Sequence, residues 1–281
     1  MNSCRIVTLY SGSGGNSTFI RVADTAILID AGKNSKRLCM ALKSIGSDIE
    51  EIRAIFVTHD HADHTSALEV LAKKHNIPIH ITEESAKVFD RIAPSPIHSR
   101  LVRHTPIFSV EVGDLVVSSF MTPHDSLMSV GYRIEFFDGE EKRSFGVATD
   151  IGHVTDDIKE GLTGCEAVVL ESNHDLQMLR NGSYPDMLKR RILSNRGHLS
   201  NIDSAALSAY LAERGTRAFL LAHLSEENNE RSLAYEETER AISDVGVSIA
   251  IAAPDIPVEL KIPTLEEMEN DRREIYNPWN A

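Results

Sequence analysis

The amino-acid sequence predicts an α/β protein of two mixed β-sheets with helices on their outer faces. Short apolar segments bounded by glycine, proline and polar turns dominate the beginning of the chain, and segments of helical periodicity then alternate with them. This alternation is typical of layered architectures in which helices cover sheets. The chain of 281 residues can bury a sizeable core, and its 42% hydrophobic and 25% charged residues are ordinary for a globular protein. We find no fixed-period repeat and no linker that would separate a second domain.

In the first half of the chain, β-branched and aromatic residues mark the strands and turn residues separate them. A glycine-rich turn at residues 11–17 divides the first two strands, and Pro78 opens a later one. The expected strands lie at residues 5–10, 18–22, 26–29, 53–57, 78–81, 107–110, 115–120, 129–137 and 144–148. The expected helices lie at residues 35–45, 65–74 and 83–91.

The second half repeats the same rhythm of a helix followed by an apolar strand. The expected helices lie at residues 155–161, 184–193, 203–214 and 229–244, and the expected strands at 167–170, 218–221 and 248–252. Apolar segments this short are typical of buried strands in a layered protein.

A run of metal-binding residue types follows the strand predicted at residues 53–57. His59, His61, Asp63 and His64 lie within six residues. Imidazole and carboxylate groups suit zinc, with manganese or iron as alternatives. In an extended backbone, His59 and His61 would point the same way, whereas Asp63 and His64, past a turn, could reach a second metal. The alternative is a solvated polar loop with chance histidines, and three histidines in six residues argue against it.

Three further residues of the same types each follow a predicted strand. His124, Asp150 and His223 come directly after, or shortly after, the strands at 115–120, 144–148 and 218–221. A single histidine after a strand is more often a structural hydrogen-bonding group. Together with the first run, however, the set provides five histidines and two aspartates. Seven ligands are what two neighbouring metals need if one carboxylate bridges them.

The distribution of charge leaves the question of a nucleic-acid partner open. The net charge of −13 disfavours such a partner, but acidic residues are concentrated after residue 225. Between residues 178 and 201 a basic stretch has only Asp186 as an acidic member; it contains Arg180, Lys189, Arg190, Arg191 and Arg196. Such a stretch can bind phosphates through local contacts, or it can be a solvated helix face.

Other sequence features exclude several classes of protein. The N-terminus lacks a basic segment followed by an apolar core, and no apolar run is long enough to span a membrane, so we expect a cytoplasmic protein. Cys4, Cys39 and Cys165 are odd in number and lack CxxC spacing, which argues against a disulfide framework or a cysteine zinc site. We expect reduced, mostly buried thiols.

These motifs resemble those of the metallo-β-lactamase superfamily. The similarity includes the HxHxDH run at 59–64, the later histidine, aspartate and histidine, and the opening segments at 11–17 and 28–32, and it spans nearly the whole chain. It implies a four-layer αββα sandwich over residues 1–262, followed by an acidic tail at 263–281. It also implies which metal each ligand binds: His59, His61 and His124 the first, Asp63, His64 and His223 the second, with Asp150 bridging both.

Within the superfamily, two segments look most like the YycJ/WalJ-type subgroup, whose members are regarded as 5′-to-3′ exonucleases. They are ESNHD at residues 171–175 and RGHLSN at residues 196–201. The same segments are similar to the phosphodiesterase and ribonuclease Z branches, in which a histidine in such a loop assists catalysis. The chain has no long inserted arm like that of ribonuclease Z, so the resemblance favours DNA over transfer RNA.

The resemblance implies a mechanism in which two divalent cations, zinc or alternatively manganese, generate the attacking hydroxide. We expect His198, Asp63 and Asp150 to be the catalytic residues. His198 is the candidate general acid, or alternatively a structural cap at the following helix. His174 could bind a phosphate, orient His198 or hydrogen-bond a strand end. Asp60 could fix the tautomer of a ligand imidazole, or lie in solvent.

The function that the sequence favours is therefore a two-metal phosphodiesterase, and specifically a 5′-to-3′ exodeoxyribonuclease that acts on DNA, including single strands. His174, Arg190, Arg191 and Arg196 are the candidate substrate contacts. One alternative is a hydrolase of a cyclic phosphodiester, lactone or thioester, which the acidic net charge favours. Another is a catalytically silent binding module, against which the complete ligand set argues. The sequence does not indicate an oligomeric state.

Overall fold

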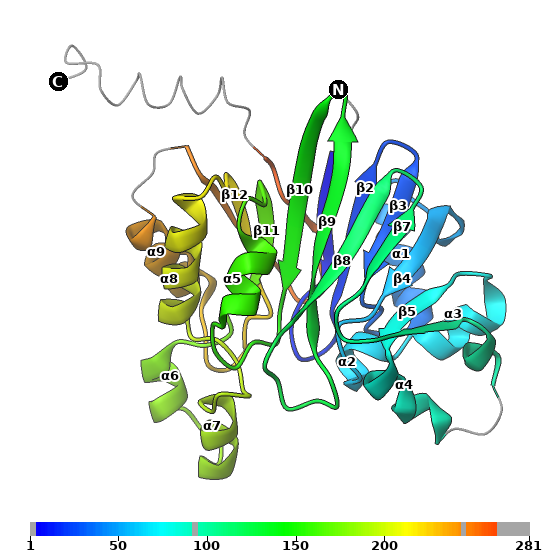
Figure 1. The fold of residues 1–281 in the computed structure, drawn as a ribbon. Helices are drawn as coiled ribbons and strands as arrows, with labels where there is room; N and C mark the ends of the chain where they lie inside the picture. The colour runs from blue at the N-terminus through cyan, green and yellow to red at the C-terminus, as the bar shows by residue number, and fades with distance from the viewer. Residues whose placement is uncertain (1–3, 92–94, 243–245, 263–281) are drawn as a thin grey trace.

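The computed structural model describes residues 4–91, 95–242 and 246–262, and within them two seven-stranded sheets pack face to face (Figure 1). The first sheet has the order β14 (Val258–Glu259), β1 (Cys4–Tyr10), β2 (Ser17–Val22), β3 (Thr25–Ile29), β4 (Ile52–Phe56), β5 (Ile79–Thr82) and β6 (Leu101–His104). The second has the order β13 (Ser248–Ile251), β12 (Ala218–Ala222), β11 (Ala167–Glu171), β10 (Glu141–Ala148), β9 (Val130–Asp138), β8 (Leu115–Met121) and β7 (Ser109–Val112).

Helices cover the outer face of each sheet, so the molecule has four layers (Figure 1). Against the first sheet lie α1 (Ser35–Ser44), α3 (Leu68–Lys74) and α4 (Glu83–Asp90). Against the second lie α5 (Asp156–Leu162), α8 (Asn201–Ala212) and α9 (Arg231–Ala241). The αββα sandwich that the sequence predicted is confirmed.

The period-two alternation of side chains along the strands produces the layers. In β1, Ile6 packs between the sheets whereas Val7 packs under the outer helices. In β11, Val169 packs between the sheets and Val168 under the helices of the other side. Both faces of the central strands are therefore apolar, which is why these segments read as continuous hydrophobic runs in the sequence.

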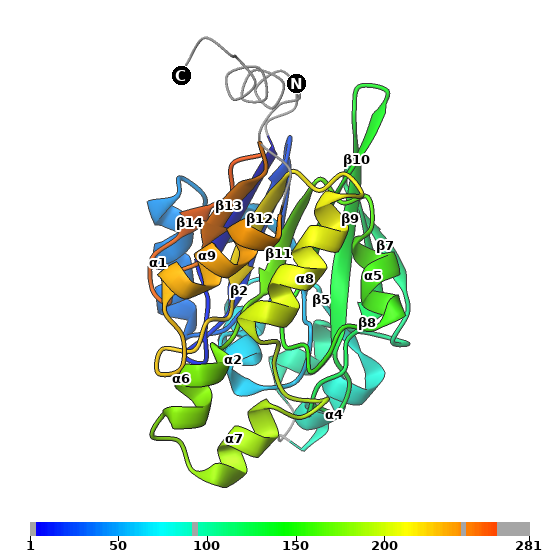
Figure 2. The same ribbon diagram turned by 90° about the vertical axis from the view of Figure 1, so that its left-hand side faces the viewer.

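The strand directions bring the carboxyl ends of the central strands to one end of the molecule. Strands β3 to β6 are mutually parallel, and so are β10 to β13. At this end lie α2 (Ala62–Thr65), α6 (Leu176–Asn181) and α7 (Asp186–Ile192), as Figure 2 shows. Ligands of open α/β sheets commonly bind beyond the carboxyl ends of the strands, so this end is the place to look for a site.

Some elements differ from those predicted. Strands β6 and β14 and helix α6 were missed, because β6 is a half-exposed edge strand of LVRH and the other two are very short. The strand predicted at 107–110 begins two residues later, at Ser109. The predicted end of the helix at 229–244 and the acidic tail at 263–281 lie outside the described residues.

The single helix predicted at residues 65–74 is interrupted between α2 and α3, and hydrogen bonds to neighbouring loops explain the interruption. The carbonyl of Asp63 accepts from the backbone N–H of Asn16 at 2.7 Å, while the N–H of Ala67 donates to the carbonyl of Ala31 at 2.9 Å. In a continuous helix, the N–H of Ala67 would instead donate to Asp63. The turn at α2 is thereby tied to the loops that follow β1 and β3.

None of the described helices is long and apolar enough to cross a membrane. All three cysteines are free thiols, as expected, but only Cys165 is buried, whereas Cys4 and Cys39 are half-buried. The expectation of mostly buried thiols was wrong because Cys4 lies at the start of the first strand and Cys39 on the outer helix α1.

We predict that Gly32→Ala destabilises the fold, because Gly32 lies where these loops cross. A Cβ there would lie 1.9 Å from the carbonyl oxygen of Asp63 and 2.4 Å from the backbone nitrogen of Asn16. Overpacking of this kind costs about 1–3 kcal/mol of unfolding free energy, which a urea titration would measure.

Gly14→Ala is the matched control for this substitution. A Cβ at Gly14 would meet only the flexible end of Lys33, with Nζ at 2.9 Å. Gly14→Ala should therefore leave the urea midpoint nearly unchanged. If the two variants unfold at the same urea concentration, the close approach of the loops at Gly32 does not constrain the fold.

Candidate metal centre

The metal-binding run lies in the loop and short helix that follow β4. His59 and His61 belong to the loop, and His61 is the N-cap residue of α2, whose first turn carries Asp63 and His64. The strand end is fixed in place, because the hydroxyl of Tyr132 donates to the carbonyl of Val57 at 2.6 Å. The ring centroid of His59 lies 4.6 Å from that of His61 and 4.1 Å from that of His64, so the loop and the helix bring these side chains together.

The residues that close the site from other strands have unusual backbone conformations. Asp30, Asp150 and His223 follow β3, β10 and β12, and all three are non-glycine residues with positive φ, at 62°, 58° and 58°. Such conformations cost about 1–3 kcal/mol each and persist where the surrounding structure enforces them. Their clustering at these strand ends indicates that the backbone is held there to aim particular side chains.

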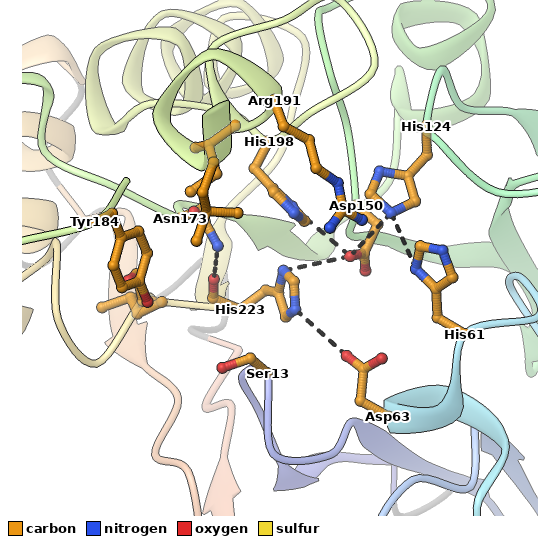
Figure 3. A pocket seen from close by; sticks show the side chains of 14 residues that line it. Ser13, His61, Asp63, His124, Asp150, Asn173, Tyr184, Arg191, His198 and His223 are labelled. Carbon is orange, nitrogen blue, oxygen red and sulfur yellow. Dashed lines mark hydrogen bonds and ion pairs between the residues drawn. The ribbon is translucent and has the colours of Figure 1, made fainter. Parts of the chain in front are cut away.

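The structure brings all seven predicted ligands together. In each of three overlapping groups, nitrogen or oxygen atoms lie within 4.8 Å of one another; the groups are His59, His61 and His124; His59, His64 and Asp150; and Asp63, His64 and His223. The carboxylate of Asp150 lies 3.3 Å from Nε2 of His64. It also lies 3.8 Å from Nε2 of His124, and Figure 3 shows it among His124, His198 and His223. The arrangement suits two adjacent cations that share Asp150.

Each of four ligand imidazoles is oriented by a hydrogen bond from the ring nitrogen that faces away from the centre. Nδ1 of His59 donates to the hydroxyl of Thr58, and Nδ1 of His124 to the carbonyl of Gly197. Nδ1 of His64 donates to Asp30 and Nδ1 of His223 to Glu171, each at 2.8 Å. Nε2 of His64 lies 3.0 Å from Nδ2 of Asn16, and Nε2 of His124 lies 3.4 Å from Nδ1 of His61. Fixing one ring nitrogen by an outer hydrogen bond is how metal-ligating histidines are normally oriented.

The carboxylates of Asp30 and Glu171 were not predicted as site residues. Asp30 is buried and also accepts from the backbone N–H and hydroxyl of Thr58. Glu171 is fully buried and accepts from four donors. Both are acidic residues at the end of an apolar strand, which is the same signal that pointed to Asp150.

The expectation that Asp60 fixes an imidazole tautomer was wrong. Its Oδ1 accepts from the backbone N–H of Leu127 at 3.0 Å, which ties the loop of the metal-binding run to the loop after β8. Asp60 points toward that loop because it alternates with His59 and His61 in the extended segment.

Several buried polar atoms of the centre have no hydrogen-bond partner among the residues that the structure describes, and this fits the binding of cations. They include Nε2 of His59, Nε2 of His223 and Oδ2 of Asp150. Unsatisfied buried atoms are costly, so a cluster of them around one carboxylate is expected to bind a ligand. Five imidazoles and two carboxylates form the donor set that zinc or manganese accepts.

The charges at the centre support the same conclusion. Burial lowers the pKa of both His59 and His124, so these rings are neutral and can accept a metal bond. Burial acts to lower the pKa of His223 as well, but Asp150 and Glu171 raise it to about 10. The buried carboxylates thus create a strong demand for positive charge, which divalent cations would meet.

His198 lines the cavity beside the ligands and is oriented by Glu171. Its Nδ1 donates to Oε1 of Glu171 at 2.9 Å, and the backbone N–H of Leu199 donates to Oε2 at 3.0 Å. The side chain is 18% exposed, so Nε2 can meet a bound molecule. The alternative that His198 caps a helix is not observed, because the hydroxyl of Ser200 caps α8.

His174 is buried and does not line the cavity. It is 1% exposed, neither of its ring nitrogens has a hydrogen-bond partner among the described residues, and burial lowers its pKa to about 4. Its backbone carbonyl accepts from the N–H of Asn201 at 2.9 Å, which joins the end of β11 to the start of α8. The ring is not among the residues that line the cavity, which argues against direct contact with a phosphate.

The predicted basic stretch is used largely for internal contacts. Nε of Arg196 donates to the carbonyl of His124 at 2.8 Å, so this residue supports the loop that carries a metal ligand. Arg191 forms an ion pair with Asp125 beside the cavity. Arg190 is exposed on α7, and no described residue forms a hydrogen bond or ion pair with it. Of the three candidate arginines, Arg190 is therefore the one whose guanidinium is left for a ligand.

A cavity of about 310 Å³ opens over the centre. Loops of both sheets and α7 line it, and the residues are Ser13, His61, Asp63, His124, Asp150, Asn173, Tyr184, Leu188, Arg191, Ile192, His198, His223, Leu224 and Ser225. The cavity can hold a small ligand or one unit of a polymer.

Known proteins resemble this chain in sequence and in fold. Residues 25–224 match the family model of the beta-lactamase superfamily domain. The chain is 34% identical over 261 residues to exodeoxyribonuclease YycJ of Bacillus anthracis, which covers 91% of this chain and 96% of the relative. It is 33% identical over 266 residues to exodeoxyribonuclease WalJ of Streptococcus pneumoniae, covering 92% and 96%.

Solved structures of low sequence identity have the same fold. The metallo-β-lactamase fold protein YhfI from Bacillus subtilis has a TM-score of 0.68 and 15% identity, covering 92% of this chain and all of that one. Zn(2+)-bound PqqB from Methylobacterium extorquens has a TM-score of 0.67 and 18% identity, covering 90% and 99%. The chain belongs to the beta-lactamase superfamily, with the metallo-β-lactamase fold, and within it to the family of YycJ and WalJ.

Proposed function

We propose that this protein is a two-metal exodeoxyribonuclease that hydrolyses DNA from the 5′ end. The observation that carries the proposal is the pairing of seven converging metal ligands with His198, which Glu171 orients toward the same cavity. Relatives that match more than nine-tenths of the chain are exodeoxyribonucleases by name, which supports DNA as the substrate.

The seven ligands would hold two divalent ions, zinc or manganese. Such ions would lower the pKa of a water so that hydroxide is available as the nucleophile, and they would offset the negative charge of the phosphodiester. The side chains of the protein provide the remaining chemistry. Because the carboxylate of Glu171 accepts from Nδ1 of His198, it stabilises the protonated ring and leaves Nε2–H to face the cavity. That proton can pass to the O3′ oxygen as the P–O3′ bond breaks.

A second candidate function is the hydrolysis of a small phosphodiester, lactone or thioester. It is favoured by the contacts of Arg191 and Arg196, which satisfy two of the three arginines expected to bind DNA phosphates. The net charge of −13 points the same way. The tests below separate the two functions.

Labelled single strands test the activity and its polarity together. With zinc or manganese added, a 5′ label should be released at once as a mononucleotide, whereas a 3′ label should pass through a ladder of shortening products. Chelation should stop both, and a circular strand should resist. Early release of the 3′ label would reverse the polarity, and hydrolysis of bis(4-nitrophenyl) phosphate alone would favour the small-molecule function.

Asp150→Asn should remove a shared metal ligand while keeping the fold. Asparagine tolerates the positive φ of this position, so the substitution removes the negative charge without changing the backbone conformation. Loss of a residue that only hydrogen-bonds a ligand can lower activity by up to ~100-fold, and the loss in Asp150→Asn should be larger. We expect two metals per parent chain, and elemental analysis of the variant should find fewer. Glu171→Gln is the milder comparison. Unchanged metal content in Asp150→Asn would contradict the shared site.

His198→Ala should slow the hydrolysis of DNA much more than that of bis(4-nitrophenyl) phosphate. An alkoxide leaves with a proton whereas a nitrophenolate leaves without one, so the loss should be ~100-fold or more only for DNA. His153→Ala is a matched control, because that exposed ring only contacts the carbonyl of Asn195. Equal losses on the two substrates would mean that His198 binds or supports the structure instead.

Arg190→Ala should weaken the binding of single-stranded DNA and reduce its salt dependence. Each lost phosphate contact lowers the slope of log affinity against log salt by ~0.7 on a single strand. Arg240→Ala, on the distant helix α9, removes the same charge elsewhere and should not change the slope. Identical slopes for the parent and Arg190→Ala would show that this side chain is only a solvated helix residue.

A further inference from the structure

The cavity over the metal centre has two chemically different parts. One part consists of the metal-binding groups and His198, and it is polar and charged. The rest of the lining combines the apolar or aromatic side chains of Tyr184, Leu188, Ile192 and Leu224 with Ser13, Asn173, Arg191 and Ser225. Three of the four apolar or aromatic residues come from α7 and the loop before it, so a single segment provides most of the apolar surface.

Among the described residues that line the cavity, Tyr184 is the one with a phenyl-type ring, and the other aromatic rings are the imidazoles of the four histidines. Figure 3 shows its ring on the side of the cavity away from His61 and His124, with His223 and His198 between. The side chain is half-buried, and in the part of the chain that the structure describes neither its hydroxyl has a hydrogen-bond partner nor its ring an aromatic neighbour. Because Tyr184 lines the cavity, part of its side chain can contact a bound ligand.

The segment that carries Tyr184 is held in place at several points. The hydroxyl of Ser183 donates to Glu227 at 3.3 Å, and Pro185 fixes the backbone on the other side. Nζ of Lys189 donates to the carbonyl of Arg180 at 2.9 Å, which joins α7 to α6. The ion pair between Arg191 and Asp125 ties α7 to the loop after β8. A ring presented this firmly loses little further freedom when a ligand packs on it.

We propose that Tyr184, with Leu188 beside it, forms the subsite that binds the base of the 5′-terminal nucleotide by stacking. The proposal rests on the nuclease function proposed above and names the part of the substrate that this wall recognises. A nucleotide combines an anionic phosphate with a flat, weakly polar base, and the cavity offers a cationic centre beside an apolar aromatic wall. Every base has a π-face, so stacking recognises a terminal base without selecting a sequence.

The position of His198 determines which nucleotide occupies the subsite. Hydrolysis from the 5′ end forms a bond from water to phosphorus and breaks the P–O3′ bond, and the proton from His198 goes to O3′ of the terminal nucleotide. That nucleotide must then lie on the side of His198, which in Figure 3 is the side toward Tyr184. The cavity volume of about 310 Å³ suits one nucleoside better than a continuing strand.

The test compares two single-stranded DNAs that differ only at the 5′-terminal nucleotide, one with thymine and one abasic. The measured quantity is the ratio of kcat/KM for the first cleavage of the two strands. The parent should prefer the base-bearing end by about tenfold or more. Tyr184→Ala should reduce this ratio to about one, Tyr184→Phe should keep it, and Tyr235→Ala, on α9, should behave like the parent.

Tyr184→Leu is the second variant, because it keeps apolar bulk and removes the π-face. If Tyr184→Ala does not fold, as judged by thermal unfolding, the reduced ratio is expected in Tyr184→Leu. A parent-like preference in either folded variant, or no preference in the parent, would overturn the subsite while leaving the nuclease function standing. If the parent degrades neither strand, the proposed function fails and the subsite fails with it.

Discussion

The burial of ionisable side chains between the carboxyl ends of two sheets is the constraint on which the rest of the structure depends. Asp30, Asp150 and Glu171 are each at most 3% exposed, and they lie among histidines that are nearly as buried. Buried charges are tolerated only when they are paired, hydrogen-bonded or bound to metal. Glu171 and Asp30 are satisfied by hydrogen bonds from the protein, whereas Oδ2 of Asp150 is not. The protein thus separates carboxylates that orient ligands from the one that is left for cations.

This separation depends on backbone geometry that the fold enforces. Three strand ends with positive φ aim the side chains of Asp30, Asp150 and His223, and Gly32 allows two loops to cross without a Cβ between them. Conformations of this kind are unfavourable in isolation, so the surrounding sheets must maintain them. The large apolar core on both faces of each sheet gives the free energy and rigidity for this. The site is therefore a property of the whole sandwich, although its ligands come from short loops.

The sequence indicated which side chains converge at the strand ends because their signal is local: a metal-binding residue type directly after an apolar strand. His59, His61 and His64 are recognisable from six residues, and the fold then brings the distant His124 and His223 to them. The roles of Asp60, Arg191 and Arg196 could not be predicted from the sequence. Each depends on a backbone group or carboxylate of a different loop, which only the folded chain brings next to the side chain. The break between α2 and α3 has the same origin, since Asn16 takes the carbonyl that the helix would have used.

If the proposed function and subsite hold, the two parts of the cavity separate the chemistry from the recognition of the substrate. The metal ligands, His198 and Glu171 all extend from strand ends or from loops joined to them by hydrogen bonds, where a shift of one side chain would disturb several others. Tyr184 and Leu188 instead belong to α7 and the loop before it, which lie outside the two sheets and are held by contacts such as the ion pair of Arg191 with Asp125. Substitutions there can change the ligand that fits without disturbing the buried charges. Because the fold fixes the reacting centre so firmly, differences in substrate among proteins of this fold are expected to arise in such peripheral segments.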